Sequence, residues 1–188
     1  MEVTTALLVA MMYITILTFG IAGIVNGIAS ILIPAAKERP HWLPFSWVAL
    51  LLLIHLNLFW ETLTILKQPD WAFAEFLLVI IGPILLYLTS NVMLTGGGEG
   101  SSAFSLLHYM AVRERFFVGL CFLMIWAICV ELILGKGVLV NSAGDLAALA
   151  LFASLAVCKG NRLSGILTIV GWILILALIT LQASGVIS

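Results

Sequence analysis

Six long apolar segments follow one another along the chain, separated by short polar connections. They lie at residues 4–34, 42–66, 71–93, 116–134, 138–158 and 163–182. A helix needs roughly 20 apolar residues to cross the hydrocarbon of a bilayer, and each segment is close to that length or longer. The pattern predicts an all-α polytopic membrane protein. We expect one transmembrane domain over residues 1–188, with six transmembrane helices in a compact bundle.

Composition identifies lipid as the expected solvent of this chain. Hydrophobic residues make up 63% of it and charged residues only 9%, whereas a soluble domain carries roughly a quarter charged residues. We therefore expect membrane lipids to be its main partners. The formal net charge of −1 does not favour binding to nucleic acid, which requires a strongly basic surface, so no nucleic-acid partner is expected.

The cationic residues sort by connection. Six of the eight fall in or beside the first, third and fifth connections: Lys37, Arg39, Arg113, Arg115, Lys159 and Arg162. Only Lys67 and Lys136 fall in the second and fourth. Because Lys and Arg in short connections stay in the cytoplasm, we expect both termini to lie outside it.

Acidic residues gather toward the side opposite the cationic connections. They are Glu61, Asp70, Glu75, Glu131 and Asp145, together with Glu2. An acidic outer mouth would raise the local concentration of cations and exclude anions. The alternative is that these acids simply avoid the hydrocarbon and stop at the interface. Glu61 and Asp145 fit that alternative worst, since each lies more than a turn inside its segment.

Polar residues inside the second segment are the first candidates for a transport path. Asn57 and Glu61 are four residues apart and share a helix face, and His55 lies near the middle of the segment. A neutral imidazole and a buried carboxylate can both exchange protons. These three residues predict a polar path along the helix. The alternative is hydrogen bonding between helices that fixes their packing.

A second polar pair follows a proline in the third segment. Tyr87 and Asn91 are four apart and come just after Gly82-Pro83. Proline inside a helix releases a backbone carbonyl, which predicts a kink or a site that uses this carbonyl. Glu131 and Asp145 complete the set of transport-path candidates.

Other features predict how the helices pack and meet the membrane surface. Gly20, Gly23 and Gly27 fall on nearly one face and predict close helix packing. Residues 95–103 form a glycine-rich flexible cytoplasmic linker, and residues 104–117 predict an interfacial helix whose Arg113 and Arg115 face lipid headgroups or a partner. We expect tryptophans at the membrane interface, namely Trp42, Trp47, Trp60 and Trp71.

The sequence contains no motif for a known chemistry. It has no Walker loop, GxSxG or HExxH, and its three histidines do not have metal-ligand spacing. We expect no catalytic residue, metal or cofactor.

The leading interpretation is a channel or small transporter, and because six short helices make a narrow bundle, we include a homo-oligomer among its expected forms. One alternative is a non-transporting scaffold, sensor or effector subunit that uses residues 96–115. Another is an intramembrane lipid-modifying enzyme that uses His55 with Glu61, or Glu131 with Asp145.

Several short motifs between Gly20 and Phe117 occur in an order that resembles a known family. They are Gly20-Ile-Ala-Gly-Ile-Val-Asn-Gly27, His41-Trp-Leu-Pro-Phe-Ser-Trp47, Phe59-Trp60, Gly82-Pro-Ile-Leu-Leu-Tyr87, His108-Tyr109 and Arg115-Phe-Phe117. In this order they resemble a family of small bacterial integral membrane proteins of uncharacterised activity. The resemblance covers about half the chain. It implies a bacterial inner membrane as location, and it transfers no activity and no site residues.

Overall fold

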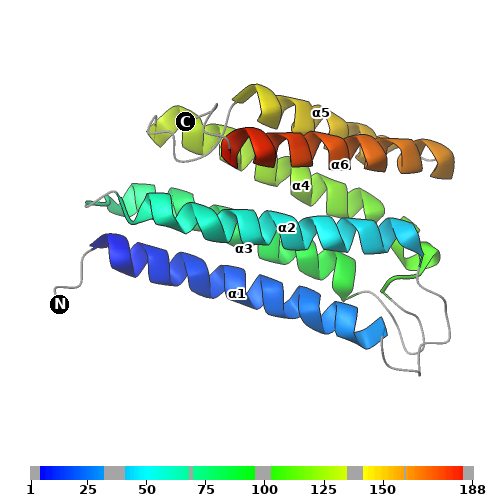
Figure 1. The fold of residues 1–188 in the computed structure, drawn as a ribbon, viewed down its shortest axis with the longest axis horizontal. Coiled ribbons are helices and arrows are strands. Elements are labelled where there is room, and N and C mark those ends of the chain that lie inside the picture. The colour runs from blue at the N-terminus through cyan, green and yellow to red at the C-terminus, as the bar shows by residue number, and fades with distance from the viewer. Residues whose placement is uncertain are drawn as a thin grey trace.

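The computed structural model describes residues 5–31, 41–67, 70–95, 103–134, 142–158 and 160–183, which form six helices. These are α1 (Thr5–Ile31), α2 (Trp42–Ile65), α3 (Phe73–Leu94), α4 (Leu106–Leu134), α5 (Ser142–Val157) and α6 (Asn161–Ala183). Successive helices run in opposite directions, so α1 begins and α6 ends at the same end of the bundle (Figure 1). The described part of the chain is all-α, as predicted.

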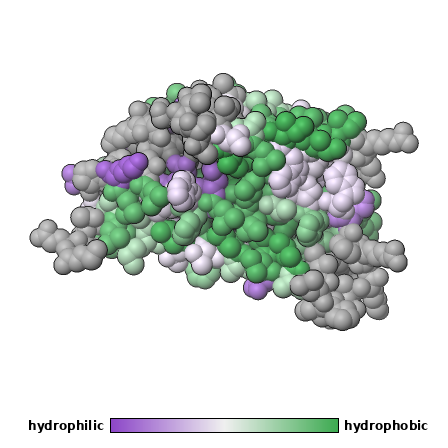
Figure 2. All heavy atoms as spheres, in the orientation of Figure 1, coloured by the Kyte–Doolittle hydropathy of each residue, from purple (hydrophilic) through white to green (hydrophobic). Residues whose placement is uncertain are grey.

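Length and composition support a membrane location for this bundle. Four helices, α1 to α4, are long and apolar enough to cross a membrane, while α5 and α6 contain shorter apolar stretches. Large apolar side chains are exposed on every helix; examples are Phe19, Trp60, Phe73, Leu107, Leu146 and Ile173. Hydrophobic residues also cover much of the face drawn in Figure 2. Such a surface suits lipid rather than water.

The helices pack in two groups. In the first group, α1 contacts α2 and α3. In the second group, α5 contacts α4 and α6. The groups are joined where α4 contacts α3 and α2, and where α2 contacts α6. A cluster of aromatic rings lies between the two groups, where Trp47 of α2 meets Phe116 and Phe117 of α4 and Phe152 of α5. The ring centroids in this cluster lie 4.9–6.1 Å from that of Trp47.

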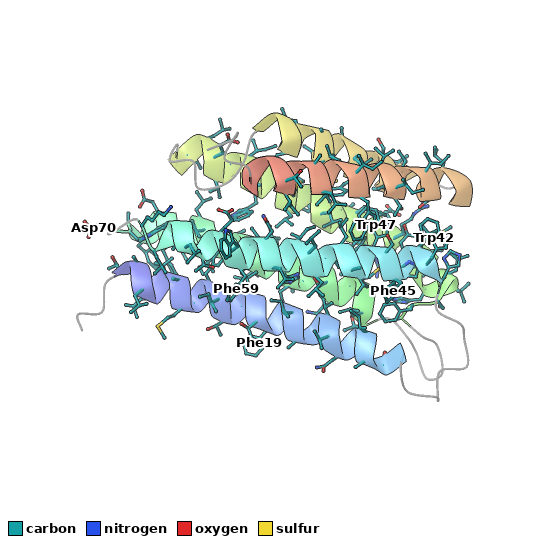
Figure 3. The ribbon with its side chains drawn as sticks, viewed as in Figure 1. Phe19, Trp42, Phe45, Trp47, Phe59 and Asp70 are labelled. Atoms are coloured by element: carbon teal, nitrogen blue, oxygen red, sulfur yellow. The ribbon has the colours of Figure 1, made fainter. Side chains whose placement is uncertain are left out.

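Trp47, one of the tryptophans expected at the membrane interface, is enclosed by protein. Its side chain is fully buried, and its indole Nε1 donates a hydrogen bond to Thr168 Oγ1 of α6 at 3.1 Å. Trp42 and Trp60 are exposed. Figure 3 shows Trp42 and Trp47 toward one end of the bundle and Asp70 at the other.

Helix α4 is longer than the fourth predicted segment. It begins at Leu106, where the Ser105 hydroxyl caps it by accepting a hydrogen bond from the backbone N–H of His108 at 3.1 Å. The amphipathic segment predicted to lie in the interface is thus the first part of this continuous helix. Residues 96–102 of the linker predicted at 95–103 lie outside the described residues, as do the cationic Lys37, Arg39, Lys136 and Lys159.

Helix α3 continues through Pro83 with help from α4. Pro83 has no N–H to offer the carbonyl of Val79. Beside it, Trp126 Nε1 of α4 donates a hydrogen bond to the carbonyl of Leu78 at 2.6 Å. The indole rests directly on Gly82, where an added Cβ would lie 2.1 Å from the ring atom Cη2 of Trp126. The proline turn is therefore a packing site between α3 and α4.

Candidate functional site

Glu131 and Asp145 form a pair of carboxyl groups between α4 and α5. Glu131 lies in the last turn of α4 and Asp145 in the first turn of α5, and these two helices pack extensively against each other. The two carboxyl groups are close enough to interact electrostatically. The structure thus brings together two of the residues that the sequence identified separately.

Both members of the pair have an unpartnered oxygen. Asp145 is 6% exposed, and its Oδ2 is buried without a hydrogen-bond partner among the described residues. Oε2 of Glu131, a half-buried residue, is also buried and unpartnered. Carboxylate oxygens in this state can take up a proton or coordinate a small cation. Within the described ranges, no group of three or more His, Cys, Asp and Glu side chains is arranged to hold a metal ion.

His55 packs against helix α1. Its imidazole is fully buried, and the Nδ1–H donates to the Leu51 carbonyl of its own helix at 2.8 Å. Nε2 is unpartnered and lies against Gly20 of α1, where an added Cβ would be only 2.2 Å away. His55 is therefore enclosed by protein at the α1–α2 contact.

Glu61 lies further along the same contact, close enough to Tyr13 of α1 to interact with it electrostatically. Along α2 the buried Leu58 comes between His55 and Glu61. Asn57 is half-buried and shares a face with Glu61, but it lies on a different face from His55, because two residues turn a helix by about 200°. The three predicted path residues are thus not joined into one continuous polar row.

The remaining acidic and polar candidates serve local roles in the helices. Asn91 donates its amide Nδ2 to the Tyr87 carbonyl one turn earlier at 3.0 Å, and Tyr87 itself is exposed. Glu75 caps α3 by accepting a hydrogen bond from the Ala72 backbone N–H at 3.1 Å.

Arg113 and Arg115, both expected to face lipid headgroups or a partner, differ in exposure. Arg115 is exposed, whereas Arg113 is buried within the bundle. Arg113 follows Tyr109 by one helical turn, so both side chains lie on the inward face of α4. Only the four-residue spacing of these two residues signals this in the sequence.

Tyr109 connects Arg113 to a polar network that the sequence did not indicate. The Tyr109 hydroxyl lies 3.3 Å from Ser164 Oγ of α6. Thr168 Oγ1 donates to the Ser164 carbonyl at 2.7 Å and accepts from Trp47 Nε1. Serine and threonine in an apolar segment are too common to identify such a network without the neighbouring helices.

The comparisons with known proteins give no match. No family model, curated protein or solved structure matches the chain. The resemblance to a bacterial membrane family therefore stays a prediction.

Proposed function

We propose that the protein is a small integral membrane transporter or channel, and that a proton or a small cation binds at the Glu131–Asp145 pair. In this proposal all six helices cross the membrane, and both termini lie outside the cytoplasm. The excess of Lys and Arg in the odd-numbered connections supports this orientation. The carboxyl pair would then lie toward the outer surface.

The observation that carries the proposal is the buried, unpartnered carboxyl of Asp145 beside that of Glu131. A buried ionisable group without a counter-charge is unfavourable, and within membrane helices such groups often mark an ion or proton pathway. Two carboxylates that share one site cannot both stay ionised without a counter-charge. A bound proton or cation supplies that counter-charge.

The path along α2 is a secondary prediction. Leu58 separates His55 from Glu61, and the imidazole lies against Gly20 of α1. This arrangement supports a packing role for His55 better than a conducting one. Glu61→Gln and His55→Ala test the α2 path in the same flux measurement as the carboxyl pair.

The proposal is tested by proton and cation flux in proteoliposomes that contain the full chain. We expect Asp145→Asn and Glu131→Gln each to lower flux at least about tenfold, which corresponds to roughly 1.4 kcal/mol of lost interaction. Glu114→Gln is the matched control, because Glu114 is an exposed acid on α4 near the opposite end of the bundle. Wild-type flux no higher than that of empty liposomes would refute transport. Full flux in both carboxyl variants would refute this site.

A further inference from the structure

We propose that Arg113, Tyr109 and Ser164 form a binding site for a phosphate-type anion. The site lies where the start of α4 meets the start of α6. Its residues and its ligand are distinct from the Glu131–Asp145 pair, so it does not rest on the proposed transport activity.

The first argument is the state of the Arg113 side chain. It is 8% exposed, and its Nε and Nη1 atoms are buried without a hydrogen-bond partner in the part of the chain that the structure describes. Guanidinium stays protonated in proteins, so this is a buried cation. Two buried donors of a cation that lack partners are unfavourable, and an anionic ligand that accepts from them would remove that penalty.

The second argument is the set of groups around the guanidinium. Tyr109 lies one turn before Arg113 and is close enough to interact with it electrostatically. Its hydroxyl pairs with the fully buried Ser164 hydroxyl. Both hydroxyls can donate to an anion by rotating their O–H bonds.

The third argument is the position of Ser164 in helix α6. The helix begins at Asn161, so Ser164 lies in its first turn. The Ser164 N–H is already bonded to the Gly160 carbonyl at 3.0 Å, so Ser164 contributes its hydroxyl group here. The positive end of the helix dipole at this N-terminus favours anions. The hydrogen bonds from Trp47 to Thr168 and from Thr168 to the Ser164 carbonyl hold this turn in place.

Phosphate is the anion that these groups suit. The planar guanidinium fork binds two phosphate oxygens at once, and the hydroxyls can serve the remaining oxygens. By its charge pattern this end of the bundle faces the cytoplasm, where anionic phospholipids are abundant. Phosphate can come from a phospholipid headgroup or from a soluble phosphate, and the two sources are separated by experiment.

The test measures binding to the purified full-length protein in an uncharged detergent free of phospholipid. One arm titrates a short-chain phosphatidylglycerol and the other inorganic phosphate, each followed by tryptophan fluorescence. We expect at least one probe to bind, with a Kd raised at least about tenfold by Arg113→Gln. The Kd should not change in Arg115→Gln, which removes the same charge from an exposed position two residues away. Binding of the lipid alone would identify a headgroup site, and binding of inorganic phosphate would identify a site for soluble phosphate.

Three results would overturn the proposal. They are no binding of either probe to wild type, an unchanged Kd in Arg113→Gln, and equal losses in the two arginine variants. If Arg113→Gln does not fold, the double variant Tyr109→Phe and Ser164→Ala replaces it. We expect this double variant to raise the Kd several-fold, and an unchanged Kd would again contradict the site.

Discussion

At the scale of single residues, Gly20 shows how a small side chain determines a helix contact. The imidazole of His55 occupies the space that a Cβ at residue 20 would take. The ring is fully buried and bonded to the Leu51 carbonyl, so it has little freedom to move aside. Gly23 differs, because an added Cβ there would meet no atom within 4 Å. The glycines that share a pattern in the sequence therefore have different roles.

We predict that Gly20→Ala destabilises the protein by about 1–3 kcal/mol, the usual cost of overpacking a filled core. Gly23→Ala is the matched control on the same helix. It should be neutral or stabilising by about 0.5–1 kcal/mol, because alanine favours helix more than glycine does. Chemical denaturation in mixed micelles measures both. Equal stability of the two variants would show that His55 does not pack on Gly20 as described.

At the scale of helices, the contact between α3 and α4 depends on Trp126. Its indole rests on Gly82 and donates to the Leu78 carbonyl beside the proline turn. We predict that Trp126→Phe destabilises the protein by about 1–2 kcal/mol, because a hydrogen bond and part of the packing are lost. Trp60→Phe should change stability by less than about 0.5 kcal/mol, since Trp60 is 70% exposed. The same denaturation measurement compares them, and similar losses in both variants would argue against a specific role for Trp126.

The sequence predicts that the helices exist, but it does not show which face of each helix points into the bundle. Long apolar runs predicted α1, α2 and α3 to within a few residues. Arg113, Glu114 and Arg115 made the start of α4 resemble an interfacial segment, because three charges in a row interrupt the apolar run. Once α4 is seen as one helix, Arg113 falls on its buried face and Arg115 on its exposed face.

The candidate sites were predictable only in part, for the same reason. Glu131 and Asp145 stood out as acids near the ends of apolar segments, but only the packing of α4 on α5 shows that they lie close enough to interact electrostatically. Ser164 and Thr168 gave no signal, since small hydroxyl residues also occur in helices without any partner. Which helices become neighbours depends on packing across the whole bundle, and the pattern along one segment does not contain it.

At the scale of the whole molecule, the buried cation Arg113 and the acidic pair of Glu131 and Asp145 lie toward opposite ends of the bundle. Arg113 lies near the start of α4 and Glu131 near its end. At 1.5 Å per residue they are about 27 Å apart along the helix, close to the thickness of the hydrocarbon core. The proposed anion site and the proposed cation site would therefore lie near opposite surfaces of the membrane.

The most direct test of this arrangement is labelling of single cysteines with an impermeant maleimide in right-side-out membrane vesicles. Cys121, Cys129 and Cys158 are first replaced by alanine, because they are unpaired. Lys67→Cys lies in the α2–α3 connection, and Gly160→Cys lies between α5 and α6, where the added side chain has open space. Six crossings with outward-facing termini predict that Lys67→Cys is labelled in sealed vesicles and Gly160→Cys only after permeabilisation. Labelling of both positions in sealed vesicles would contradict the account, because α5 and α6 would then not cross the membrane as proposed.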